Sequence, residues 1–71
     1  MSNRSVTVEA KYANEVAKRL GGIINGSTWI NPVTSKSMAL ITVLDRKESL
    51  KSTKEFKLLK KEGKISNWSQ A

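Results

Sequence analysis

The run SMALITVL at residues 37–44 decides the fold, because it contains the longest apolar stretch of this 71-residue chain. Its apolar side chains fall on both faces of an extended strand, a pattern typical of a central strand. We expect one face to meet helices. The other, carrying Ala39, Ile41 and Val43, is then left to solvent, a second copy or a partner. The sequence thus predicts a sheet built around this run, with a homodimer through Met38–Leu44 as one use of the surplus face.

Upstream of this run, the sequence predicts a short strand and then a helix. Residues 5–8 alternate between polar and valine side chains, as a half-buried strand does. Across residues 12–20 apolar side chains recur at helical spacing, and Glu15 precedes Arg19 by four residues, the favourable order for an ion pair. Gly21-Gly22 ends this helix, because glycine adopts the left-handed C-cap conformation without steric cost.

The dipeptide Asn25-Gly26 separates two β-prone segments, Ile23-Ile24 and residues 27–30. Asn-Gly favours a tight hairpin turn with positive φ angles, so we expect these segments to pair with each other. Pro32 ends the second segment. Core packing is the expected role of Trp29, and stacking on an unpaired base is the alternative.

A second helix is predicted by the spacing of Ser52-Thr53-Lys54-Glu55, which matches a capping box. In that motif the serine side chain accepts a hydrogen bond from a free backbone N–H, and the glutamate reaches back to another. The helix should run to about Glu62, with Gly63 as its stop. Phe56 and Leu59 are its expected core anchors.

These elements follow the order β-α-β-β-β-α. They predict a single α+β domain over residues 1–71, with a small, mostly antiparallel sheet and two helices packed on it. The chain has no cysteine and no histidine, which excludes disulfides, thiolate nucleophiles and the commonest metal ligands. Hydroxyl side chains lack a histidine base, and the glycines fit no phosphate-binding loop. We therefore expect a non-enzymatic protein without metal or cofactor.

Glu48, Glu55 and Glu62 recur every seven residues and could be mistaken for a magnesium site. On a helix they lie about 10 Å apart along the axis, too far to share one ion. We expect them to pair with neighbouring lysines instead.

No apolar segment has the length of a signal peptide or a membrane span, so the expected location is the cytoplasm. Thirteen basic residues against six acidic ones give a net charge of +7. A charge of this size attracts polyanions, of which nucleic acid and anionic lipid are the obvious classes.

The positive charge is concentrated in residues 46–64, which hold eight basic and three acidic residues. Spacing on the second helix places four lysines on one stripe and a fifth beside it. The stripe is either a solvated surface or a track for consecutive phosphates, and we favour the track because the glutamates are too few to balance it. The predicted nucleic-acid-binding residues are Arg46, Lys47, Lys51, Lys54, Lys57, Lys60, Lys61, Lys64 and Trp68.

Ten of the thirteen cations are lysine, a point charge, whereas arginine is the usual reader of guanine edges. We therefore expect contacts mainly to the phosphate backbone, with DNA favoured over RNA as the partner. Trp68 lies in a polar tail, where its ring must either dock on the body of the protein or serve a partner.

Two other functions use the same lysines. One is a small modulator or inhibitor that covers an acidic surface on a larger enzyme, with the apolar strand face as a second contact. The other is attachment to an anionic membrane, for which the second helix is poorly built because Phe56 and Leu59 are needed in the core.

The first 32 residues resemble the HARP-type module of annealing helicases, a DNA-binding accessory domain. The resemblance rests on Val6-x-Val8, a helix with Tyr12, Val16 and Leu20, then Gly21-Gly22 and Trp29-Ile30-Asn31-Pro32. The HARP pattern usually has an aromatic residue before the hairpin turn, where this chain has Ile23-Ile24, and these 71 residues include no helicase motor. The resemblance implies a free-standing accessory module in replication, repair, recombination or transcription. Size and charge also resemble those of small phage-encoded accessory proteins.

Overall fold

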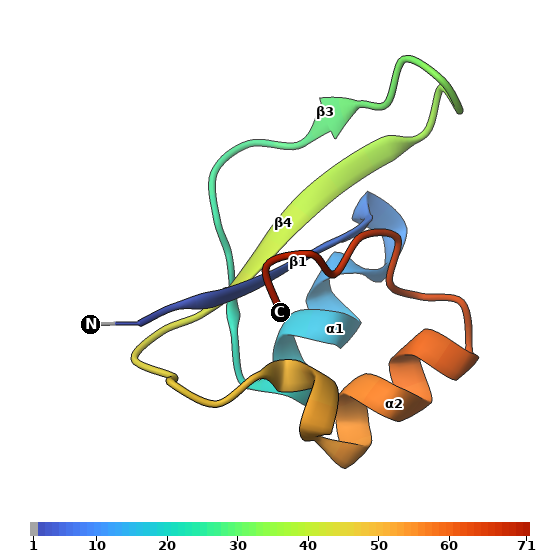
Figure 1. The fold of residues 1–71 in the computed structure, drawn as a ribbon. Coiled ribbons are helices and arrows are strands. Elements are labelled where there is room, and N and C mark those ends of the chain that lie inside the picture. The colour runs from blue at the N-terminus through green and yellow to red at the C-terminus, as the bar shows by residue number, and fades with distance from the viewer. Residues whose placement is uncertain (1) are drawn as a thin grey trace.

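The computed structural model describes residues 2–71 and shows a curved sheet with two helices beneath it (Figure 1). The predicted α+β class and the order β-α-β-β-β-α are confirmed. Two short 3₁₀ turns, η1 and η2, precede the helices. The elements are β1 (Arg4–Glu9), η1 (Ala10–Tyr12), α1 (Ala13–Leu20), β2 (Ile23–Ile24), β3 (Trp29–Ile30), β4 (Ser37–Val43), η2 (Leu50–Ser52) and α2 (Lys54–Lys61).

Strand β4 is the centre of the sheet, as its apolar run predicts. It pairs antiparallel with β1 on one side and with both β2 and β3 on the other. Val6 lies opposite Ile41 and Val8 opposite Ala39. Because opposed residues of an antiparallel pair share a face, these four side chains form one apolar layer, and each is at most 1% exposed.

Side chains on both faces of β4 are buried. Ala39, Ile41 and Val43 belong to the core cluster, so the prediction that their face is left open is wrong. On the other face Met38 and Thr42 are also buried, at 3% and 4% exposed. A homodimer through Met38–Leu44 would therefore need a surface that the core already uses. Alternation shows that a strand has two apolar faces, but it does not show which one the helices cover.

The predicted Asn25-Gly26 hairpin is also wrong, because β2 and β3 both pair with β4 and not with each other. They form one interrupted edge strand, in which residues 25–28 lie opposite only residues 39–40. A tight turn of this type needs positive φ at both central residues, and of the two only Gly26 has it, at 77°. Asn25 instead donates its backbone N–H to the carbonyl of Leu40 at 2.8 Å.

Helix α1 ends as predicted, with Gly21 at a φ of 72°, and its Glu15–Arg19 ion pair is present at 3.1 Å. Gly22 is required for a different reason. A Cβ at this position would lie 2.8 Å from the backbone oxygen of Thr42, so only glycine lets the chain pass this close to β4.

Helix α2 has the predicted anchors and the predicted stop, but a different cap. Phe56 and Leu59 are buried, and Gly63 follows the helix with a φ of 76°. The N-cap is Thr53, whose hydroxyl accepts the backbone N–H of Phe56 at 3.2 Å. The predicted capping box is therefore wrong by one residue, because the cap is Thr53 instead of Ser52. Its glutamate, Glu55, binds Arg19 instead of the backbone.

The C-terminal segment returns to the sheet and covers the outer edge of β1. The backbone N–H of Thr7 donates to the carbonyl of Asn67 at 2.8 Å, and that of Ser5 donates to the carbonyl of Gln70 at 3.1 Å. Ile65 adds a buried side chain to the core. In the described part of the chain, no helix is long and apolar enough to cross a membrane.

Candidate nucleic-acid interface

An ion-pair cluster joins α1 to α2. The guanidinium of Arg19 contacts Glu15 at 3.1 Å, Glu55 at 3.0 Å and Glu62 at 3.2 Å. Lys64 closes the cluster with contacts to Glu15 at 2.6 Å and to Glu62 at 2.9 Å. Hydrogen bonds from Arg19, and then from Lys64, lower the pKa of Glu62 to about 2. We call these five residues the Arg19 cluster.

The Arg19 cluster divides the surface of α2 into an acidic and a basic edge. Glu55 and Glu62 are seven residues apart, so they lie nearly above one another, on the side that meets Arg19. The predicted pairing of glutamates with neighbouring lysines holds only for Glu62 with Lys64. Glu55 binds Arg19 instead, and within residues 2–71 Glu48 forms no ion pair.

Lys54, Lys57 and Lys61 occupy the other edge of α2, where the predicted stripe is present. All three are exposed, and none forms an ion pair with any residue that the structure describes. The reason is that Arg19 and Lys64 already engage both glutamates of this helix.

Lys64 does not join the stripe, although its spacing predicts that it does. The spacing is valid only if the helix continues, and α2 ends at Lys61. The left-handed Gly63 then turns the chain towards α1, and the side chain of Lys64 is only 21% exposed. Lys64 is therefore a structural cation of the Arg19 cluster.

Trp68 docks on the body of the protein, which is one of its two predicted roles; its role towards a partner stays a prediction. Its ring is half-buried against the core, and the ammonium group of Lys60 lies 4.6 Å from the ring centroid. An arrangement of this kind is a cation–π contact, which fixes the lysine beside the C-terminal segment. Lys60 itself is exposed and free of carboxylates among the described residues.

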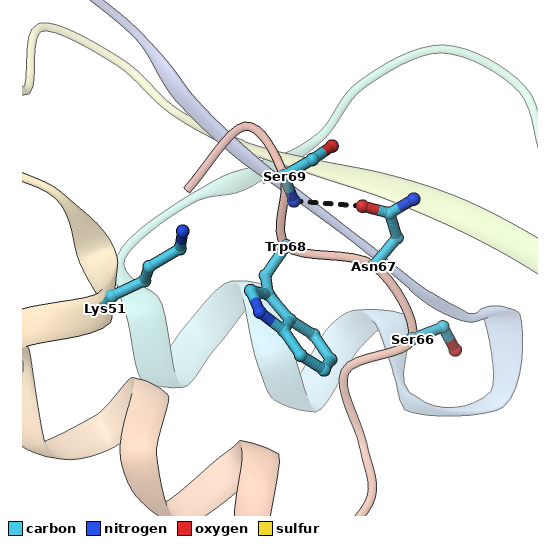
Figure 2. Close-up of a pocket in the computed structure, with 5 residues that line it drawn as sticks. All are labelled: Lys51, Ser66, Asn67, Trp68 and Ser69. Carbon is cyan, nitrogen blue, oxygen red and sulfur yellow. Dashed lines mark hydrogen bonds between the residues drawn. The ribbon is translucent and has the colours of Figure 1, made fainter.

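A cavity of about 270 Å³ opens beside Trp68 (Figure 2). Residues 66–69 form one wall and Lys51 of η2 the other, and the backbone N–H of Ser69 donates to the side-chain oxygen of Asn67 at 2.9 Å. Sequence analysis missed the polar members of this wall, because nothing in their spacing predicts that the tail folds back towards η2.

Arg46 and Lys47, two of the predicted binding residues, lie in the loop before η2 and differ in accessibility. Lys47 is exposed, but Arg46 is half-buried and its backbone N–H donates to the carbonyl of Ser2 at 2.7 Å. Arg4 donates from its guanidinium to the carbonyl of Lys47, which holds this loop against β1. Only Lys47 of the predicted pair therefore presents its charge fully to solvent.

Trp29 is 42% exposed, so its predicted core role is wrong. It lies opposite Met38 at the sheet edge, at the other end of the molecule from α2 (Figure 1). Within residues 2–71, the largest group of exposed lysines without an ion pair lies along η2 and α2, and we call it the basic surface. Its members are Lys51, Lys54, Lys57, Lys60 and Lys61, and Lys47 lies in the loop before them.

The sequence matches no family model, and neither a curated protein nor a solved structure is significantly similar to it. The fold and the basic surface are therefore the grounds for inferring a function. Of the layout shared with the HARP-type module, the structure contains the strand β1, the helix α1 and Gly21-Gly22, whereas residues 23–30 form an interrupted edge strand instead of a hairpin. That resemblance stays a prediction.

Proposed function

We propose that this protein is a non-enzymatic nucleic-acid-binding accessory protein, of use in replication, repair, recombination or transcription. The observation that carries the proposal is the set of exposed lysines of the basic surface, none of which has a carboxylate partner among residues 2–71. In a chain with a net charge of +7, these lysines are most of the exposed cations that are free to meet a polyanion; among the described residues Lys18 and Lys47 are the others.

The length of the basic surface fits a short run of phosphates. The eight residues of α2 extend for about 12 Å. One strand of DNA presents roughly three phosphates over that length. Each phosphate that a lysine neutralises releases condensed counterions, and this release favours binding without reading the base sequence. We therefore expect backbone binding with little sequence preference.

Membrane attachment has less support than nucleic-acid binding. A surface helix that inserts into lipid needs an apolar face to bury, and the two large apolar side chains on one face of α2, Phe56 and Leu59, are 2% and 0% exposed. Leu58, at 38% exposed, is the only other apolar residue of the helix. The basic surface can therefore contact a charged partner, but it offers few apolar side chains that could insert into lipid.

The test is a fluorescence anisotropy titration of labelled single-stranded DNA, double-stranded DNA and RNA at several salt concentrations between about 50 and about 200 mM. Three phosphate contacts predict a slope of about −2.7 on double-stranded DNA and about −2.1 on single strands for the logarithm of the affinity against the logarithm of the salt concentration. Random and defined sequences should bind alike. An absence of binding to all three probes at low salt would contradict the proposal and favour an acidic protein surface as the partner.

Trp68 offers an independent readout of the same binding. Trp29→Phe leaves Trp68 as the only tryptophan, and Lys60 lies over its ring. A phosphate that draws Lys60 away should change the fluorescence of Trp68 with the same midpoint as the anisotropy. A saturable anisotropy change with no fluorescence change would place the nucleic acid away from Lys60.

A further inference from the structure

The exposed apolar side chains gather at one edge of the sheet. Within residues 2–71, seven large hydrophobic residues are exposed, and five of them belong to β2, β3 and the loop after them: Ile23, Ile24, Trp29, Ile30 and Val33. Residues 20–35 include none of the thirteen basic and six acidic residues of the chain. This edge therefore combines exposed apolar side chains with a complete lack of charged residues over sixteen positions.

The backbone of this edge is also open. Asn25 and Asn31 donate their N–H groups inward, to the carbonyls of Leu40 and Lys36 at 2.8 and 2.9 Å. Because backbone groups alternate in direction along a strand, the N–H groups of Ile24 and Ile30 point away from β4. No strand within residues 2–71 pairs with this side of β2 or β3.

Sheet edges are usually protected by charged side chains, by proline, by short or bulged strands or by a covering element, and an unprotected apolar edge pairs with another chain. The β2–β3 edge is short and interrupted at residues 25–28, but it has neither charged side chains nor a covering element among residues 2–71. Pro32 lies beyond β3 and leaves Ile24 and Ile30 unprotected. The outer edge of β1, in contrast, is covered by the C-terminal segment. Only the β2–β3 edge therefore combines free backbone groups with uncharged, apolar side chains.

We propose that a second copy of this chain pairs with the β2–β3 edge, so that two antiparallel sheets join across a two-fold axis. The absence of charged residues along this edge favours a second copy over a charged partner. An acidic partner or a nucleic acid would be matched by cations, and residues 20–35 carry none. Two chains of net charge +7 repel each other, and they can approach most closely where neither is charged. A strand paired antiparallel with its own copy is also self-complementary, as a two-fold interface requires.

The position of the edge is compatible with nucleic-acid binding, although the proposal does not depend on it. Figure 1 shows β3 and α2 at opposite ends of the molecule, so a dimer through β3 leaves both copies of α2 uncovered. Two basic surfaces on one dimer could engage one nucleic acid together, which raises the overall affinity without a new contact.

The oligomeric state of the full chain tests this proposal. Sedimentation velocity from about 1 µM to about 1 mM should show a monomer converting to a dimer. Ile30→Lys places a charge on each edge at the contact and should give a monomer throughout that range. Ile30 is 60% exposed, so its circular dichroism and thermal midpoint should match those of the parent. Leu44→Lys is the matched control, because Leu44 is 55% exposed but lies after β4, and it should dimerise like the parent.

Hydrogen exchange gives a second test that needs no variant. The amides of Ile24 and Ile30 should exchange fast in dilute solution and slowly where the dimer is populated. A parent that is monomeric up to about 1 mM would overturn the proposal. So would a dimer that Ile30→Lys and Leu44→Lys leave equally intact, or a dimer in which these two amides gain no protection.

Discussion

Replacing Phe56 with alanine removes the larger of the two side chains that fix α2 to the core. The ring is 2% exposed, and truncating a buried phenylalanine to alanine costs roughly 3 to 5 kcal/mol. A 71-residue domain has a free energy of unfolding of about 4 to 11 kcal/mol in total. The substitution should therefore remove between about a third and all of the stability of the domain.

Thermal and urea unfolding followed by circular dichroism measure this loss. A domain of this size loses roughly 4 to 8 °C per kcal/mol, so the thermal midpoint should fall by about 12 to 40 °C. If the variant still folds, the urea midpoint should fall while the slope of the free energy against urea stays the same.

Leu58→Ala is the matched control, two positions further along the same helix. Leu58 is 38% exposed, so its truncation should cost less than about 1 kcal/mol. If Phe56→Ala unfolds within about 1 kcal/mol of the parent, α2 is not held by this ring, and the placement of the basic surface on the domain is refuted.

Two further predictions concern the junctions around α1. Gly22→Ala should destabilise the domain by about 1 to 3 kcal/mol in urea unfolding, because the new Cβ would lie 2.8 Å from the Thr42 backbone oxygen; unchanged stability would contradict this close approach. The second concerns Glu62, whose pKa is lowered from 4.5 to about 2 by hydrogen bonds from Arg19 and then from Lys64. Because the folded state lowers this pKa, the ion pairs of Glu62 stabilise the fold above about pH 4.5. That stabilisation is lost as the pH falls towards 2. The urea midpoint of the parent should fall over that range, and Arg19→Gln should flatten this dependence. An equally steep fall in Arg19→Gln would show that other carboxylates dominate the acid response.

Patterns within one element predicted the helices well. Gly21 and Gly63 end their helices because each supplies a left-handed residue, and Phe56 and Leu59 are buried because three-residue spacing puts them on one face. Each of these predictions needs only neighbours along the chain.

The errors in the sheet arise from contacts between distant segments. The run around Ile41 predicts a central strand, but the choice of the covered face depends on where α1 docks. Likewise, Asn25-Gly26 favours a tight turn locally, yet the backbone of Asn25 pairs with Leu40, fifteen residues away. Trp29 consequently lies at an exposed edge of the sheet, a position that its neighbours in the sequence do not predict.

The basic surface was predicted from spacing, whereas the reason for its free charge was not. Lys57 and Lys61 lie on one edge of a helix, which periodicity shows directly. Their lack of carboxylate partners depends on Arg19, which reaches Glu55 and Glu62 across 36 and 43 residues of sequence. The seven-residue spacing of Glu55 and Glu62 was the available signal, because it places both carboxylates on one side of the helix, where a single cation can reach them.

The central claim is that the lysines of α2, and not the net charge of the chain, bind nucleic acid. Two double variants separate these causes, because each removes two positive charges. Lys57→Gln with Lys61→Gln removes the centre of the basic surface, whereas Lys11→Gln with Lys36→Gln removes two lysines that contact Glu9 at 3.4 and 3.2 Å. Circular dichroism should show that both variants fold.

The deciding measurement is the affinity of these two variants for DNA across a range of salt concentrations. We expect Lys57→Gln with Lys61→Gln to weaken binding to every sequence and to reduce the steepness of the salt dependence by about 2 units. Lys11→Gln with Lys36→Gln should bind with nearly the affinity and slope of the parent. Equal losses in the two variants, or no loss in the first, would contradict a binding role for α2.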